Sequence, residues 1–197
     1  MKYVSIDIET TGLDPLDHQV IEFGAVIEDT ENPLQICGLP SFRALIKHDR
    51  IDISPFCLKM HMDTGLLEEL TKRQKERPKT WHDFIDGTHI CQPSALTPIF
   101  KRFLKSNGID PDLRVIVAGK NFNGFDRLFL DRLPLAINYH HRVLDPMPLF
   151  VRPGDKEPPN LAECAKRAGV EFKGTGYHTA VSDAIMVVEL LRKGWNK

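Results

Sequence analysis

The chain has 197 residues, of which 42% are hydrophobic and 27% are charged, and its formal net charge is -1. This length and composition predict one globular domain, 1–197, that is long enough to bury a sizeable core. They exclude a basic surface as a global feature of the molecule, although a local basic patch is compatible with a balanced total.

The cysteines and the apolar runs bear on the compartment. Four cysteines are scattered along the chain without a CxxC pair, which is typical of reduced cytosolic thiols. No apolar run approaches the roughly 20 residues that span a bilayer, and residue 1 leads directly into a strand pattern without a signal-peptide n-region. We therefore expect a cytoplasmic protein with no membrane partner.

The first half of the chain predicts strands and then a helix. Segments 3–9, 19–28 and 42–47 are rich in β-branched and aromatic residues, and the short turns between them predict an antiparallel meander. Segment 64–74 has a helical pattern. Segment 75–93 is polar and contains prolines and glycine, so we expect a surface loop or insertion there. Zinc is a weak alternative for this loop, because its possible ligands lack the usual tight pairs; they are His82, Asp86, His89 and Cys91.

The second half of the chain predicts helices around one short strand. Apolar residues from Leu96 to Leu104 recur at helical spacing, with Thr97 as the expected cap, Pro98 at the first helical position and Gly108 as the stop. A buried strand is expected at 114–118 and a helix at 125–133.

The last fifty residues begin with a proline-rich segment, 145–160, in which we expect a mobile loop. Asn160 and Glu163 predict a capped helix that ends at Gly169, and 180–193 predicts the last helix. Strands first and helices later indicate a mixed sheet flanked by helices in one α/β domain.

Two carboxylates lie at the end of the first predicted strand. Alternate residues of a strand share a face, so Asp7 and Glu9 project side by side. Two like charges a few ångströms apart repel each other unless one is protonated or a multivalent cation lies between them. Taken alone, this pair is more typical of a solvated strand end or a turn cap.

Two later segments supply further acids. Asp126 begins a predicted helix directly after the strand 114–118, and Asp183 lies in the first turn of the last helix, with His178 in the loop before it. Each of these residues alone is consistent with an acid that complements a helix dipole, or with a surface histidine. A two-metal site for phosphoryl transfer would require them to converge with Asp7 and Glu9.

The three segments resemble a known family when they are taken in order. DIETTGLD (7–14), N-x-x-x-F-D (121–126) and H-x-x-x-x-D (178–183) resemble the motifs of the DEDDh family, the DnaQ-like 3′ to 5′ exonucleases of the ribonuclease H-like superfamily. The resemblance runs from residue 3 to about residue 191. It implies an α/β fold with a ribonuclease H-like mixed five-stranded sheet flanked by helices.

The resemblance also implies the site residues. It makes Asp7, Glu9, Asp126 and Asp183 the carboxylates that hold two Mg²⁺ or Mn²⁺ ions, and His178 the general base. It further implies residues that border or shape the pocket for the terminal nucleotide, namely Thr10, Thr11, Gly12, Leu13, Asn121 and Phe125. Simple core packing is an open alternative for Leu13, and Asp145 matches a structural position.

The substrate class remains open between two resemblances. Phe56, Lys59, His61, Thr64, Gly65 and Leu66 form a pattern similar to a segment of oligoribonucleases, although these carry tryptophan where this chain has Phe56. This pattern makes His61 a candidate substrate-binding residue, unless the segment is only a helix start in which His61 is satisfied within the protein. The Thr10–Thr11 pair is more similar to proofreading subunits and ribonuclease T.

The resulting hypothesis is a metal-dependent 3′ to 5′ exonuclease that releases nucleoside 5′-monophosphates from single-stranded DNA or RNA ends. The alternatives are an oligoribonuclease-type enzyme for short RNA, a non-catalytic nucleic-acid-binding or polymerase-docking module, and an endonuclease of the same superfamily. Expected partners are single-stranded 3′ ends, with a DNA polymerase or a second copy of the chain as further possibilities. His140 and His141 beside Arg142 are expected to form a wet surface that touches phosphate.

Overall fold

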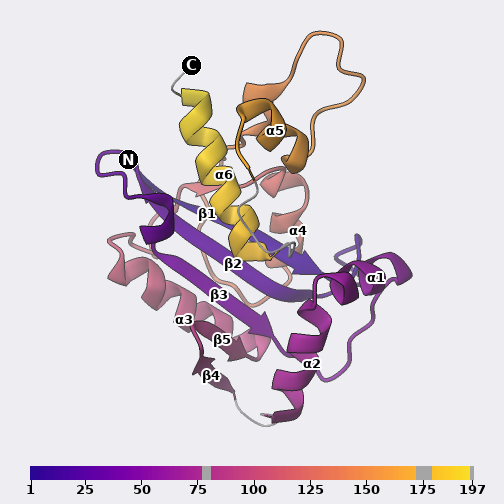
Figure 1. Cartoon of the computed structure of the whole chain (residues 1–197). Helices are drawn as coiled ribbons and strands as arrows, with labels where there is room; N and C mark the ends of the chain where they lie inside the picture. The colour runs from indigo at the N-terminus through magenta and orange to yellow at the C-terminus, as the bar shows by residue number, and fades with distance from the viewer. Residues whose placement is uncertain (77–80, 172–178, 196–197) are drawn as a thin grey trace.

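A mixed six-stranded sheet forms the centre of the computed structural model, which describes residues 1–76, 81–171 and 179–195. Within these ranges the strand order is β4-β5-β3-β2-β1-β6 (Figure 1). β1 (Lys2–Thr10), β2 (Val20–Asp29) and β3 (Ser41–Ile46) form the predicted antiparallel meander, and their bounds lie within one residue of the predicted ones. The expected α/β class with a mixed sheet is confirmed, with six strands in place of five.

The register of β1 and β2 determines which side chains meet at the carboxyl end of β1. Asp7 pairs with Gly24 and Glu9 pairs with Glu22, and the register shifts between Glu9 and Thr10. Such an irregularity bends the strand and redirects the residues that follow it. The loop after Thr10 therefore leaves the sheet close to the two carboxylates.

The prediction of a loop or insertion at 75–93 is wrong for most of its length. β4 (His82–Ile85) and β5 (Thr88–Cys91) form a hairpin, and β5 pairs in parallel with β3. The turn consists of Asp86 (φ 50°) and Gly87 (φ 79°), and Asp-Gly is a strong signal for such a two-residue hairpin turn. Because Ile90 and Cys91 become fully buried, this hairpin forms in spite of the polar composition around it.

Two helices connect β3 to the hairpin, where the sequence predicted one. The predicted helix at 64–74 corresponds to α2 (Leu66–Glu76), and α1 (Pro55–Asp63) precedes it. Ser54 caps α1 by accepting a hydrogen bond from the N–H of Cys57 at 3.2 Å, and Pro55 occupies the first helical position. Gly65, at φ 76°, separates the two helices.

The next helix, α3 (Pro93–Ser106), begins five residues before the predicted start. Pro93 takes the first helical position, and Pro98 lies inside the helix, so the predicted start at Thr97 and Pro98 is wrong. The hydroxyl of Thr97 instead donates to the carbonyl of Pro134. The predicted stop holds, because Gly108 adopts φ 77° just beyond the helix.

The segments around the second motif are shorter than predicted. β6 is confined to Val117–Ala118 and pairs in parallel with β1, and α4 spans Asp126–Leu130. The short 3₁₀ helices η1 (Ile36–Gly38) and η2 (Phe122–Gly124) lie before β3 and before α4. The chain leaves α4 through turns that precede Pro134.

The proline-rich segment 145–160 contains one 3₁₀ helix, η3 (Met147–Phe150), and is otherwise irregular, as predicted. Arg167 of α5 (Leu161–Ala168) holds this segment, because its guanidinium donates to Asp155 at 2.6 and 3.0 Å and to the carbonyl of Phe150 at 2.8 Å. The predicted Asn160 cap is confirmed by a 2.8 Å hydrogen bond from the N–H of Glu163. Mobility of the segment stays a prediction.

Helices cover both faces of the sheet. α3 packs on one face, where Leu96 and Phe100 meet Ile6 and Phe23, and α6 (Ala180–Trp195) packs on the other (Figure 1). On that second face Tyr3 and Val26 contact the core residues of α6, which are Ala184, Val187, Val188 and Leu191. Since strand residues alternate between faces, Asp7 and Glu9 share the α6 face with Tyr3.

Two sequence expectations concern the molecule as a whole. The four cysteines are free thiols, and three of them are buried, as expected for reduced residues. None of the helices in the described ranges is long and apolar enough to cross a membrane.

Candidate active site

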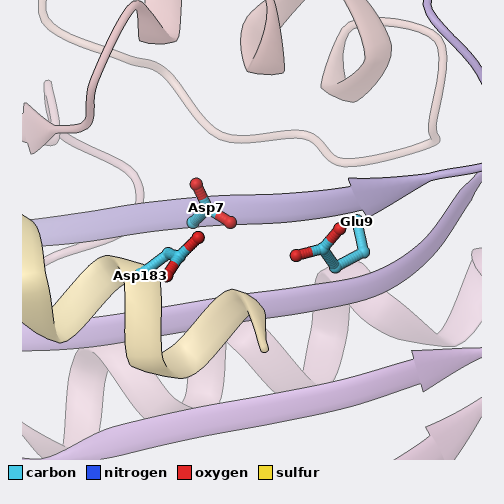
Figure 2. A group of neighbouring side chains, drawn as sticks. All are labelled: Asp7, Glu9 and Asp183. Atoms are coloured by element: carbon cyan, nitrogen blue, oxygen red, sulfur yellow. The ribbon is translucent and has the colours of Figure 1, made fainter. Parts of the chain in front are cut away.

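Three carboxylates from opposite ends of the sequence converge over β1. Asp7 and Glu9 project from β1 toward the first turn of α6, which carries Asp183 (Figure 2). One oxygen from each of the three carboxylates lies within 4.8 Å of the other two. These are the acids that the first and third sequence motifs predicted as neighbours.

The start of α6 is built by a reciprocal cap. The N–H of Ser182 donates to Oγ1 of Thr179 at 3.2 Å, and the N–H of Thr179 donates to Oγ of Ser182 at 3.0 Å. Such a capping box satisfies N–H groups that the first helical turn leaves without partners. It fixes the helix start, so Asp183 is presented to β1 from a regular first turn.

Asp126 completes the set from a third element. It is the first residue of α4, it is buried, and its carboxylate accepts hydrogen bonds from the backbone N–H groups of Ile8 and of Asp126 itself. The bond from Ile8 places Asp126 beside β1, between the positions of Asp7 and Glu9 in the chain. The side chains of all four predicted metal-site acids are therefore close enough to influence one another's pKa.

The pKa shifts describe an electrostatically strained cluster. Burial raises the pKa of Asp7 well above its usual range, and the charges of Asp126, Asp183 and Glu9 raise it further. Burial, with help from Glu22 and Asp183, raises the pKa of Glu9 to about 9. Burial also raises the pKa of Asp126 to about 7, although its backbone hydrogen bonds oppose this change.

The donor set fits a hard divalent cation. Carboxylate oxygens are the ligands that Mg²⁺ and Mn²⁺ prefer. A cation among these groups would remove the repulsion that raises their pKa values, so binding is favoured by the strain of the metal-free site. Asp7, Glu9 and Asp183 would hold such an ion, with Asp126 adjacent.

A fifth carboxylate, Glu22, was not predicted from the sequence. It lies directly across from Glu9 on β2, is fully buried, and raises the pKa of both Asp7 and Glu9. Its sequence signal is a single acid inside the apolar run 20–27. A buried charge in such a run needs a partner, and Arg43 of β3 provides it with an Nε to Oε1 distance of 2.5 Å.

The loop after β1 uses most of its predicted pocket residues internally. Thr10 and Thr11 are buried; the hydroxyl of Thr10 donates to the carbonyl of Gly12 at 2.7 Å, and Oγ1 of Thr11 accepts from the N–H of Gln19 at 2.9 Å. Leu13 is different, because 74% of it is exposed. The core-packing alternative for Leu13 is therefore wrong, whereas its contact with a nucleotide stays a prediction.

Gly12 and His61 support the same loop. A Cβ on Gly12 would lie 2.1 Å from the ring of His18, so a larger residue there would displace this histidine. His61 of α1 is buried, and its Nε2 lies 2.8 Å from the carbonyl oxygen of Thr10. Burial lowers the pKa of His61. The alternative in which His61 is satisfied within the protein is thus confirmed, and direct substrate binding stays a prediction.

The second motif places its residues beside Asp126. Asn121 is exposed with φ 58°, an uncommon left-handed conformation, and its N–H donates to Asp145 at 2.9 Å. Asp145 also accepts from the N–H of Met147 at 2.8 Å, which confirms its structural role. Phe125 is half-buried against Phe129. Roles for Asn121 and Phe125 in substrate binding stay predictions.

Two further expectations from the sequence concern the general base and a possible zinc site. His178, the predicted general base, lies outside the described residues, so its role also stays a prediction. Within the described ranges the possible zinc ligands of segment 75–93 form no group of three, and Asp7, Glu9 and Asp183 form the one such group of metal-binding side chains. His82 and His89 instead share a hydrogen bond of 2.8 Å.

A family model described as "Exonuclease" matches residues 4–191. Among curated proteins, the oligoribonuclease of Vibrio campbellii (strain ATCC BAA-1116) is 23% identical over 140 residues, which cover 71% of this chain and 68% of that protein. The oligoribonuclease of Pasteurella multocida (strain Pm70) is 25% identical over 142 residues, covering 71% of this chain and 67% of that protein.

Solved structures share the fold at low sequence identity. Cell-death related nuclease 4 matches with a TM-score of 0.68 and 14% identity, over 99% of this chain and 64% of that chain. The nuclease domain of 3′hExo, a DEDDh family member bound to rAMP, matches with a TM-score of 0.62 and 15% identity, over 97% and 90%. Escherichia coli exonuclease I in complex with a dT13 oligonucleotide matches with a TM-score of 0.58 and 18% identity, over 98% of this chain and 40% of that chain. This chain thus spans less than two thirds of the first and third of these proteins.

Proposed function

Because the chain belongs to the exonuclease family, we propose that it removes nucleoside 5′-monophosphates from single-stranded 3′ ends with divalent metal ions held by Asp7, Glu9, Asp126 and Asp183. The family predicted from the three motifs is confirmed, and the chain is a 3′ to 5′ exonuclease, a phosphodiester hydrolase. The residue roles, the two ions and the product belong to the proposal. The observation that carries it is the convergence of carboxylates from β1 and α6 within 4.8 Å.

The proposed reaction is hydrolysis of the phosphodiester bond at the 3′ end of the strand. Divalent ions would supply Lewis-acid stabilisation of the phosphate and activate the attacking water. His178 takes the water proton, since the pKa of an unperturbed imidazole, near 6.5, suits a base at neutral pH. The water oxygen bonds to phosphorus as the bond to the 3′ oxygen breaks, and that oxygen gains a proton from solvent.

Residues around the acids orient the strand. Leu13, four residues after Glu9 in the chain, offers an exposed apolar side chain suited to contact with the terminal base. Asn121 and Phe125 flank η2, and Phe125 directly precedes Asp126 at the start of α4. Thr10, Thr11, Gly12 and His61 contribute by holding the loop that presents Leu13.

The direct test is an assay with a 3′-labelled single strand. Labelled mononucleotide should be the first product in Mg²⁺ or Mn²⁺, and chelation with EDTA should stop its release. A circular single strand of the same composition should remain intact, whereas an endonuclease of the same superfamily would linearise it. Full release in EDTA would contradict the proposal, and no release under any metal would favour a non-catalytic nucleic-acid-binding or polymerase-docking module.

An oligoribonuclease-type activity on short RNA is a second candidate, favoured by the curated relatives, which are oligoribonucleases. Matched DNA and RNA oligomers of increasing length discriminate between the two. The second candidate predicts that kcat/KM is highest for RNA of a few nucleotides and falls with length. Equal rates on long DNA and RNA would exclude it.

Some expectations remain predictions. The acidic cluster is suited to divalent ions, and the identity and number of these ions are part of the proposal. A polymerase partner, a homodimer and a cytoplasmic location also stay predictions.

A further inference from the structure

The structure assigns to Glu22 a positioning role in this site: it holds the first turn of α6, and with it Asp183, against β1. This inference rests on the proposed function, which it deepens. Nothing in the three sequence motifs includes Glu22 or its partner Arg43. The argument depends on the contacts of one fully buried side chain.

Each oxygen of Glu22 has a different partner. Oε1 accepts from Nε of Arg43 on β3 at 2.5 Å, and Oε2 accepts from the backbone N–H of Ala180 at 3.2 Å. Ala180 is the first residue of α6, and N–H groups in a first helical turn have no partner within the helix. A carboxylate from β2 thus fixes the helix start, three residues before Asp183.

Gly24 shows independently that this contact is close. A Cβ on Gly24 would lie 2.2 Å from the carbonyl carbon of Ala180 and 2.4 Å from the nitrogen of Val181. Gly24 pairs with Asp7 across the sheet, so the helix start lies directly beside that acid. Any side chain at this position would push the first turn of α6 away from β1.

Arg43 keeps Glu22 in this role. Its Nη1 and Nη2 donate to the carboxylate of Glu69 on α2 at 3.1 and 2.9 Å, while its Nε donates to Glu22. This bracing by β3 and α2 fixes the direction in which Glu22 points. Because Arg43 binds Oε1 of Glu22, Oε2 is left to accept from the backbone of α6.

The other end of α6 provides a matched control. Glu28 is also a buried residue of β2 and also accepts from an arginine, with its Oε2 2.5 Å from Nε of Arg192. Arg192 lies nine residues beyond Asp183, or about 13 Å along a helix. Loss of Glu28 should therefore weaken the docking of α6 without displacing the acids.

The experiment compares Glu22→Gln and Glu28→Gln with the wild-type chain, residues 1–197. Three quantities are measured: the melting temperature, kcat and KM on a single-stranded oligonucleotide, and the affinity for Mn²⁺ alone by calorimetry without substrate. We expect both variants to lower the melting temperature. Glu22→Gln should also lower kcat by about 10- to 100-fold and weaken Mn²⁺ binding at least about fivefold, with KM for the strand changed less than about twofold, as for outer partners of metal ligands.

The control and a second variant separate positioning from other effects. Glu28→Gln should keep kcat and Mn²⁺ affinity within about twofold of wild type. Arg43→Gln should weaken Mn²⁺ binding and lower kcat, because Glu22 loses the side chain that holds it in place. If Arg43 instead affected the site only through its positive charge, its removal should make Mn²⁺ bind more tightly. Arg43→Gln also provides the test if Glu22→Gln fails to fold.

Several outcomes would overturn the inference. They are wild-type kcat and Mn²⁺ affinity in Glu22→Gln, equal losses in Glu22→Gln and Glu28→Gln, or tighter Mn²⁺ binding by Arg43→Gln. An active wild type with an unchanged Glu22→Gln overturns the positioning role alone. An inactive wild type that binds no Mn²⁺ overturns the proposed function, and the inference falls with it.

Discussion

Each carboxylate at the end of β1 raises the free energy of the metal-free fold. Burial and mutual repulsion act in the same direction on Asp7 and Glu9, and they raise both pKa values. The sequence was sufficient to predict these two acids as neighbours, because the period of a strand places them on one face. It did not reveal Glu22, since the pairing of Glu9 with Glu22 depends on the register of β2 against β1.

The raised pKa of Glu9 has a consequence for stability. An acid whose pKa is higher in the folded state stabilises the fold fully below its unfolded pKa, and this contribution is lost as pH rises toward the folded value. With a shift from 4.5 to about 9, the metal-free protein should lose stability between pH 7 and pH 9. One such group corresponds to about 1.4 kcal/mol per pH unit, or about 3–5 °C in melting temperature.

Thermal melts in EDTA at pH 7, 8 and 9 measure this effect. Glu9→Gln should show a flatter dependence, and saturating Mg²⁺ should remove the fall in the wild type. A melting temperature of the wild type in EDTA that stays constant or rises over this range would show that the acids are not strained.

Leu13 carries a second prediction at this scale. Leu13→Ala should lower kcat/KM on single strands by about three- to tenfold, because burial of a leucine against a base contributes on the order of 1 kcal/mol. Leu113→Ala is the control, because Leu113 is another leucine with a largely exposed side chain, at 65%. It lies five residues after Gly108, which is beside Lys2 at the end of β1 away from the acids. Equal effects of the two substitutions on kcat/KM would remove Leu13 from the pocket.

Among the elements, the β4–β5 hairpin shows how a local signal prevails over composition. Prolines and polar residues made 75–93 look like a loop, yet the pair Asp86 and Gly87 forms a two-residue turn with both φ angles positive. The signal was present in the sequence. The parallel pairing of β5 with β3 could not be read from the sequence, because it depends on how α1 and α2 pack in the segment between the two strands.

Gly87→Ala tests the hairpin turn. An alanine at φ 79° should cost about 1 kcal/mol and lower the melting temperature by about 2–4 °C, without changing kcat. Gly38→Ala is the matched control, because Gly38 has no atom near its Cβ position and no positive φ. An unchanged melting temperature in Gly87→Ala would mean that this turn is not required in its observed form.

For the whole molecule, the site exists because the topology brings three distant segments to one end of β1. β1 supplies two acids, α4 follows the parallel strand β6 and supplies Asp126, and α6 crosses the same face and supplies Asp183. The order of the motifs predicted this convergence, and the structure gives it distances. The bracing by Glu22, Gly24 and Arg43 could not be predicted, since none of the three motifs includes these residues and their contacts depend on the register of β2 and on the docking of α6.

Metal-dependent release of labelled mononucleotide by Asp183→Asn is the most direct test of this convergence. Asp183 reaches Asp7 and Glu9 only through the fold, so its loss should reduce the rate in Mn²⁺ by at least about 100-fold while the chain remains folded. Glu189→Gln, on the same helix, should keep wild-type activity. If folded Asp183→Asn cleaves within about twofold of the wild-type rate, the three carboxylates do not form the active site.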